Sequence, residues 1–135
     1  MVRVRRVRSV GLDRVGWSGL MRRGEIRLVD LEPARGAEAN KRRPAVIVTN
    51  DGANQTAMRL GRGVITVVPV TSNVGRVYPF QVLLPSAVTG LDLDSKAQAE
   101  QVRSVDVGRI GVRVGAVPNA ILTLLDEALR LHLAL

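Results

Sequence analysis

Cysteine is absent from the 135 residues of this chain, and histidine occurs only once, at His132. Without cysteine there is no disulfide, no thiolate nucleophile and no cysteine metal ligand, a composition that fits a reducing compartment. One histidine does not suffice for a zinc site made of protein side chains. We therefore expect a protein that works without a metal ion or another cofactor.

Long apolar runs are also missing. No run approaches the roughly 20 residues that a membrane-spanning helix needs. The first residues carry positive charge, as a signal peptide does, but Asp13 and Arg14 interrupt any apolar segment that could follow. The sequence therefore predicts a cytoplasmic protein that does not enter a membrane.

The positive charge is concentrated at the start of the chain. Residues 1–23 hold seven arginines and one aspartate, a net charge of +6 out of the +8 of the whole chain. We expect residues 1–20 to form a basic N-terminal extension and residues 21–135 to form one domain, which is large enough for a core. The extension could contact phosphate groups nonspecifically or be disordered. The sequence does not decide whether translation starts at Met1 or at Met21.

Short apolar segments between glycine and proline turns predict a mainly β fold. Ile26 and Leu28 alternate with Arg27 and Val29, as they would in a strand. Further strands are expected at residues 45–49, 64–70, 80–84 and 112–117. Pro69 indicates a sheet edge, a bulge or a strand end. Such a series of short strands is typical of a small barrel or sandwich.

Two segments towards the C-terminus complete the expected elements. Residues 96–103 are ambiguous, because their Ala, Gln, Glu and Lys side chains favour a helix while the segment also suits a strand. Pro118 fits the first turn of a helix that runs to about Leu133. We expect this helix to pack on the sheet through one apolar face. That face consists of Leu122, Leu125 and Leu129.

Two polar clusters lie at the ends of predicted strands. Three consecutive cations, Lys41 to Arg43, stand just before one strand, and three hydrogen-bonding residues, Thr71 to Asn73, follow another. Each cluster alone is typical of a solvated loop or an ordinary turn. If the two strands pair, however, the guanidinium of Arg43 and the hydroxyl of Thr71 converge on one anionic ligand.

Five segments, in this order and spacing, resemble the MazF/PemK family of toxin endoribonucleases. They are Arg23–Ile26, Gly36–Glu38 with Arg43–Pro44, Val68–Thr71, Tyr78–Val82 and Glu100–Ser104. None is specific by itself, but together they cover the chain from Met21 onward. The resemblance implies an α+β fold that is mainly β with a C-terminal helix, an SH3-like small barrel as in MazF and CcdB toxins. It also implies that residues 96–103 form a strand.

The resemblance further implies the toxin of a type II toxin-antitoxin system, a sequence-selective endoribonuclease that cleaves single-stranded RNA and thereby inhibits translation and growth. The chain lacks cysteine, and His132 is expected to be a surface or packing residue. The remaining chemical route is attack by the RNA's own 2′-hydroxyl on the adjacent phosphorus. This route needs no metal and leaves 2′,3′-cyclic phosphate and 5′-hydroxyl ends.

Arg43 and Thr71 are the expected catalytic pair. The guanidinium of Arg43 can grip two phosphate oxygens, and Thr71 can donate its hydroxyl to the same phosphate. Arginine stays protonated, so the candidate base is Glu38, which matches a position in the family's active-site loop; a solvated loop carboxylate is the alternative. By resemblance, Arg42 is an auxiliary phosphate contact. The residues implied to line an RNA groove are Lys41, Ser72, Asn73, Glu100 and Gln101.

The resemblance implies two partners besides RNA. One is a second copy of the chain in a two-fold homodimer. The other is a cognate antitoxin whose acidic, disordered tail competes with RNA for the same cations. Arg27 departs from the family, which often has an aromatic residue there. We expect Tyr78 and Phe80 in the core, so that base recognition depends on polar contacts rather than on stacking.

Two other functions stay open. A toxin of the CcdB kind shares the fold but poisons a topoisomerase through a C-terminal tryptophan segment, whereas this chain ends in Leu131–Leu135 without one. A non-catalytic nucleic-acid-binding barrel would use the cations at 41–43 and the basic extension only as phosphate contacts.

Overall fold

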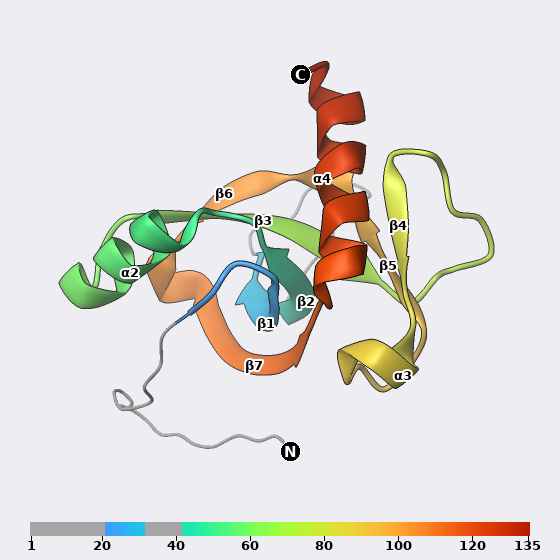
Figure 1. The fold of residues 1–135 in the computed structure, drawn as a ribbon. Coiled ribbons are helices and arrows are strands. Elements are labelled where there is room, and N and C mark those ends of the chain that lie inside the picture. The colour runs from blue at the N-terminus through green and yellow to red at the C-terminus, as the bar shows by residue number, and fades with distance from the viewer. Residues whose placement is uncertain (1–20, 32–41) are drawn as a thin grey trace.

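Seven strands and a long C-terminal helix make up the part of the chain that the structure describes, residues 21–31 and 42–135 of a computed structural model (Figure 1). The strands are β1 (Glu25–Asp30), β2 (Arg42–Ile47), β3 (Val64–Thr71), β4 (Gln81–Leu84), β5 (Ser95–Gln98), β6 (Arg103–Asp106) and β7 (Ile110–Ala116). The helices are α2 (Asp51–Leu60), α3 (Ser86–Thr89) and α4 (Asn119–Leu133). The predicted fold class, mainly β with a C-terminal helix, is confirmed.

Strand β3 is the centre of the antiparallel sheet, whose order is β4-β5-β3-β2-β1-β7 with β6 also paired to β3. On the side away from β2, β3 pairs first with β6 at Val64–Val67 and then with β5 at Val70 and Thr71. Pro69 lies between these two partners. The Thr66 carbonyl accepts a hydrogen bond from Val48, after β2, so the backbone groups of residue 69 point by alternation away from β2. On that side neither β5 nor β6 pairs with residue 69, so the missing N–H of proline breaks no ladder hydrogen bond.

Two apolar cores lie on opposite faces of β3. Val68 and Val70 face one core and Ile65 and Val67 face the other, as the alternation of a strand requires. The helix α4 covers the first core with Leu125, which is fully buried. Leu122 and Leu129 pack against that core, so the predicted face of the helix is confirmed. The second core is covered by α2 through Ala57 and Met58.

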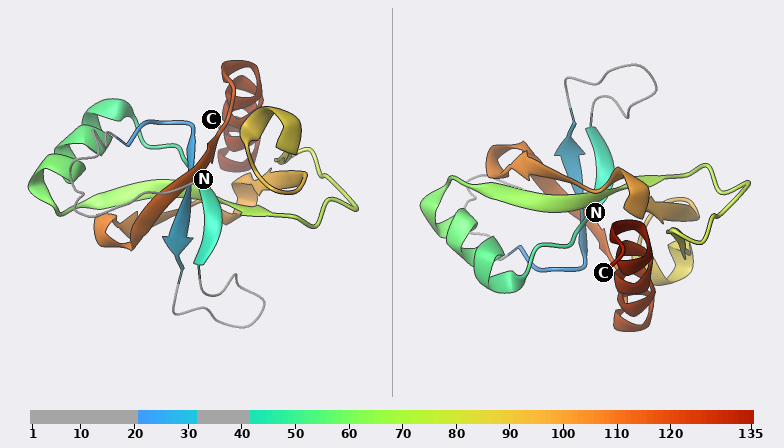
Figure 2. Two further views of the ribbon diagram at one scale, coloured as in Figure 1. Left: turned by 90° about the horizontal axis from the view of Figure 1, so that it is seen from below. Right: turned by 90° about the horizontal axis from the view of Figure 1, so that it is seen from above.

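Helix α2 is an element that the sequence analysis did not predict. Its N-terminus is capped by Asn50, whose Oδ1 accepts a hydrogen bond from the Ala53 N–H at 2.9 Å. Gly61 ends it in the left-handed conformation, with φ of 67°, and donates its N–H to the Ala57 carbonyl at 2.9 Å. The views agree that α2 and α3 lie at opposite ends of the molecule (Figure 2).

The ambiguous segment at 96–103 divides into three parts. It contains most of β5, a short 3-10 helix at Ala99–Gln101 called η1, and the start of β6. The expectation of one strand is therefore confirmed only for residues 96–98 and 103 and is wrong for residues 99–102. The interruption carries the chain from one end of β3 to the other, since β5 and β6 pair with different halves of that strand.

A buried ion pair lies within β1. Arg27 is only 6% exposed and contacts the Glu25 carboxylate at 2.9 Å from its Nη2, while its Nη1 donates to the Gly111 carbonyl at 3.2 Å. Burial lowers the pKa of Arg27, and the charge of Glu25 opposes that shift. The charge of Arg27, at a position where the resemblance implies an aromatic ring, is thus stabilised by the Glu25 carboxylate.

Within the described residues, no helix has the length and apolar character needed to cross a membrane.

Candidate active site

Arg43 and Thr71 lie side by side on neighbouring strands. The register of β2 and β3 pairs Ala45 with Pro69, and continuing it by two residues sets Arg43 opposite Thr71. The Arg43 Nη2 donates to the Val70 carbonyl over a long 3.4 Å, which brings the guanidinium to the end of β3. Both side chains lie on the face of the sheet opposite Val70. The strand register therefore supports the expected convergence of the Arg43 guanidinium and the Thr71 hydroxyl.

Thr71 begins a tight polar turn. Its Oγ1 accepts a hydrogen bond from the Asn73 N–H at 3.2 Å, and the Asn73 side chain in turn accepts from the Gly75 N–H at 3.4 Å. These are the local bonds that Thr and Asn side chains make to their own backbone. Because the Thr71 oxygen acts as the acceptor here, its O–H is left to donate to a ligand.

A second polar pair lies on the same face, where β4 meets η1. The Gln81 side chain is 8% exposed and donates from Nε2 to Glu100 Oε2 at 2.8 Å, while its Oε1 accepts from the Tyr78 N–H at 3.1 Å. The other carboxylate oxygen, Glu100 Oε1, is buried and has no hydrogen-bond partner within the described part of the chain. A buried acceptor without a donor is costly, so this atom is suited to receive one from a ligand.

Lys96 is the third polar group at this end. The register pairs it with Thr71 on one side and with Leu83 on the other. Its Nζ donates to the Arg76 carbonyl at 2.5 Å, and the residue is 7% exposed. The sequence analysis did not single out Lys96 or Gln81 as site residues. Both are buried through contacts with the segment at 72–80, and a sequence pattern does not reveal such contacts. Gln81 does occur in the Tyr78–Val82 segment of the resemblance.

The other predicted groove residues that the structure describes lie at exposed positions. Ser72 and Asn73 are exposed directly after Thr71, and Gln101 is exposed beside Glu100 in η1. Arg42 is exposed at the start of β2, but alternation puts its side chain on the face opposite Arg43, and its guanidinium lies near Gly111 of β7. Glu38 and Lys41 lie outside the described residues.

The prediction that Tyr78 belongs to the core is wrong. Its side chain is 42% exposed, while Phe80 is half-buried. The two rings stack in parallel with their centroids 5.4 Å apart, and the Arg76 guanidinium lies 5.5 Å from the Tyr78 centroid. The rings belong to the connection between β3 and β4, which is exposed along most of its length. An exposed aromatic surface therefore borders the site.

His132 is exposed in the last turn of α4, as expected for a surface residue. In the ranges 21–31 and 42–135, no group of three or more His, Cys, Asp or Glu side chains is placed to hold a metal ion.

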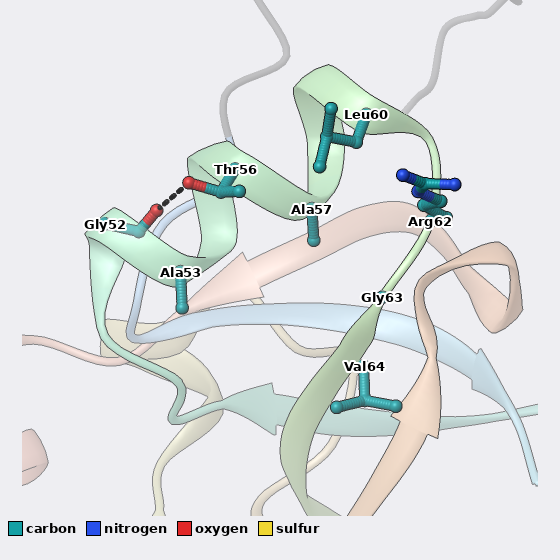
Figure 3. Close-up of a pocket in the computed structure, with 8 residues that line it drawn as sticks. All are labelled: Gly52, Ala53, Thr56, Ala57, Leu60, Arg62, Gly63 and Val64. Carbon is teal, nitrogen blue, oxygen red and sulfur yellow. Dashed lines mark hydrogen bonds between the residues drawn. The ribbon is translucent and has the colours of Figure 1, made fainter.

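An open hollow of about 570 Å³ lies at the other end of β3, beside α2 (Figure 3). Its lining is mostly small or apolar, with Leu60 and Val64 at one side, and Arg62 is its single charged residue. The Thr56 hydroxyl there donates to the Gly52 carbonyl of its own helix at 3.0 Å (Figure 3). None of the predicted site residues lines this hollow. A hollow without convergent polar groups does not suggest catalysis, whereas the polar end of β3 does.

An antiparallel sheet of this order with a C-terminal helix is a fold that solved proteins share. The chain is similar to MazF from Deinococcus radiodurans, with 25% identity and a TM-score of 0.70 over 86% of this chain and 98% of that one. It also shares its fold with Mycobacterium tuberculosis toxin MazF-mt6, at 24% identity and a TM-score of 0.65 over 82% and 97%. A third neighbour is a mycobacterial endoribonuclease in complex with its cognate antitoxin, at 21% identity and a TM-score of 0.65 over 85% and 96%.

Sequence comparison narrows the class. The family of PemK-like, MazF-like toxins of type II toxin-antitoxin systems matches residues 22–133. Endoribonuclease MazF9 of Mycobacterium tuberculosis is 66% identical over 116 residues, which cover 86% of this chain and 98% of that protein. Endoribonuclease MazF of Staphylococcus saprophyticus is 28% identical over 117 residues, 86% of this chain and 93% of that protein. The chain belongs to the PemK-like, MazF-like toxin family and is an endoribonuclease.

Proposed function

We propose that this endoribonuclease cuts single-stranded RNA at selected sequences by attack of the RNA's own 2′-hydroxyl, without a metal ion, and so inhibits translation and growth. The observation that carries the proposal is the placement of Arg43 beside the end of β3, where Thr71 lies. A phosphate between them would meet a guanidinium and a hydroxyl at once. The products are a 2′,3′-cyclic phosphate and a 5′-hydroxyl.

Arg43 and Thr71 are proposed to stabilise the charge that builds on the phosphoryl oxygens. The planar guanidinium of Arg43 can donate two parallel hydrogen bonds to one phosphate, which a lysine cannot do. The Thr71 O–H adds a third donor. Donors fixed in place before the reaction stabilise a developing charge without having to reorganise, which makes this contribution large.

Proton transfer is assigned to Glu38. Arginine remains protonated, so a carboxylate is the better base for the 2′-hydroxyl. The assignment rests on the resemblance alone, and a solvated loop carboxylate is the alternative. Cleavage by Glu38→Gln decides between the two: a catalytic base predicts a large loss of rate across the whole pH range, and a solvated carboxylate predicts the wild-type rate.

The RNA groove is proposed to extend from the end of β3 to η1. Glu100 Oε1 supports this, because it is buried without a hydrogen-bond partner among residues 21–31 and 42–135, and a base amino group could supply a donor. The exposed ring of Tyr78 adds a surface on which a base could stack. The proposed groove residues are Lys41, Arg42, Ser72, Asn73, Glu100 and Gln101.

We further propose that the toxin is a homodimer and is bound by a cognate antitoxin. One solved neighbour is an endoribonuclease with its antitoxin, which supports the second partner. Large exposed leucines on α4 and just beyond its end, among them Leu124, Leu131 and Leu135, support an interface. An acidic antitoxin tail would compete with RNA for Arg43. We place the toxin in the cytoplasm, with residues 21–135 as the domain and residues 1–20 as a basic extension.

One experiment tests the proposed reaction. Purified protein is incubated with total RNA in EDTA, and the cut ends are mapped by sequencing and by end-group chemistry. Cuts at a recurring sequence with 5′-hydroxyl and 2′,3′-cyclic phosphate ends are expected. Cleavage that disappears in EDTA, or that leaves 5′-phosphate ends, would overturn the proposal. Thr71→Ala should leave the protein nearly inactive in cutting while RNA affinity stays mostly intact, which separates catalysis from binding.

A further inference from the structure

Lys96 is a buried cation at the end of the sheet where Thr71 lies. Its exposed fraction is 7%, and its strand register sets it directly opposite Thr71. Since Val70 and Ala97 form the neighbouring pair and both face the α4 core, Lys96 and Thr71 share the opposite face, which also carries Arg43. Lys96 therefore lies directly across the ladder from the proposed catalytic Thr71, on the same face of the sheet.

The charge of Lys96 is only partly compensated. The Nζ donates to the Arg76 carbonyl at 2.5 Å and lies 5.9 Å from the centroid of the Tyr78 ring. Among the residues that the structure describes, no carboxylate forms an ion pair with it. An ammonium has three N–H donors, so the carbonyl leaves capacity for an acceptor. A buried cation without an opposite charge is costly to the fold and favours an anionic ligand.

The groups that cover the Lys96 ammonium belong to residues at the surface. Arg76 and Tyr78, which contact the ammonium, are themselves exposed. An anion that binds at this end of the sheet and displaces part of this cover would meet an ammonium that has already lost most of its water. An already desolvated and positioned charge binds an anion more strongly than a solvated lysine does, because less has to be rearranged.

We propose that Lys96 is a further RNA-binding residue, whose ammonium contacts the backbone phosphate next to the one held by Arg43 and Thr71. The inference rests on the proposed function and deepens it. It assigns to Lys96 a ligand of the same chemistry as that of Arg43, a phosphodiester, and makes the end of β3 a site for two consecutive phosphates. Holding the second phosphate would fix the direction in which the strand of RNA leaves the catalytic pair.

The salt dependence of binding tests the proposal directly. Affinity is measured between low and physiological salt for a short single-stranded RNA that carries 2′-O-methyl groups and so cannot be cut. Each phosphate neutralised by the protein contributes about −0.7 to the slope of log affinity against log salt for a single strand. Lys96→Met keeps the length of the side chain and removes its charge. It should make the slope less negative by about 0.7, whereas Lys96→Arg should keep the wild-type slope.

Two controls keep the outcome decisive. Arg62→Gln removes an exposed cation at the far hollow and should leave the slope unchanged. Lys96→Met should unfold at or above the wild-type temperature, since an apolar group replaces a buried charge, which shows that the variant is folded. If wild-type protein binds and cuts RNA but Lys96→Met has the wild-type slope, Lys96 only anchors the Arg76 backbone and the inference is wrong. If wild-type protein neither binds nor cuts RNA, the proposed function itself fails.

Discussion

The two ends of β3 differ in what they bury. At the α2 end, beside Val64, the surface is hollowed, but its lining is small and apolar and holds only one charge, on Arg62. At the other end, Lys96 and Gln81 are more than nine-tenths buried and hydrogen-bonded. An open hollow at the surface costs little free energy of folding, whereas burying polar groups destabilises a protein unless they are paired. The end with the buried polar groups is therefore the better candidate for the function.

The largest effect on stability is expected from a buried charge that lies at neither end. Arg27→Ala would leave the Glu25 carboxylate buried without its partner, which should lower the free energy of unfolding by about 3 to 5 kcal/mol. Urea denaturation measures it. A double variant with Arg27→Met and Glu25→Gln should recover most of that loss. If Arg27→Ala has the wild-type free energy of unfolding, a buried charge is not costly in this protein. The burial of Lys96 then no longer points to a function at that end of β3.

The rate of RNA cleavage tests which end of β3 carries the site. Arg43→Ala and Thr71→Ala should each slow RNA cleavage by about 100- to 1000-fold, or about 2.7 to 4 kcal/mol, as for the loss of one donor to a developing oxyanion. Initial rates on a defined RNA measure this. Arg62→Ala, at the hollow, is the matched control and should cut at the wild-type rate. A loss with Arg62→Ala as large as with Arg43→Ala would move the site to the α2 end.

A smaller effect is expected from the hydrogen bonds of Gln81. Gln81→Leu leaves the Tyr78 N–H and the Glu100 carboxylate without a partner, which should lower the free energy of unfolding by about 1 to 3 kcal/mol. Gln101→Leu, at an exposed position beside Glu100, should unfold at the wild-type urea concentration. Equal stability of the two variants would show that burial of Gln81 contributes nothing.

The smallest effect belongs to the α2 end. Asn50→Ala removes the side chain that caps the helix and should cost about 1 kcal/mol in thermal or urea unfolding. Gln55→Ala, exposed in the middle of α2, should unfold like the wild type or slightly above it. Neither change should alter the cleavage rate. A cleavage defect in folded Asn50→Ala would couple α2 to the site and weaken the contrast between the two ends.

The elements with strong local patterns were predictable from the sequence. The apolar strands and the leucine face of α4 follow from alternation and from helical spacing, and both were found. The helix α2 was missed because only Ala57 and Met58 contact the core, so its apolar pattern is weak. Its ends did carry signals, since Asn50 is a favoured N-cap residue and Gly61 a favoured terminator.

The site was predictable only where it follows strand ends. Arg43 lies at the start of one strand and Thr71 at the end of another, so their approach required only that the two strands pair antiparallel. Lys96 and Gln81 read as ordinary polar residues of a strand, and their burial arises from the chain at 72–80 folding back over them. Tyr78 was misassigned for the related reason that an aromatic ring in a short motif does not reveal which side of a sheet the segment crosses.

Pro69 also decides where the chain can cross the sheet. Since β5 leaves β3 and β6 joins it around this residue, the link between them, η1, passes beside β3 and delivers Glu100 to the polar end. An uninterrupted ladder would carry residues 95–106 straight along β3 and deprive this end of its carboxylate. Because Pro69 has no backbone N–H, the ladder along β3 can be interrupted there. The interruption is where the link η1 brings the Glu100 carboxylate to the end of the sheet that carries Arg43 and Lys96.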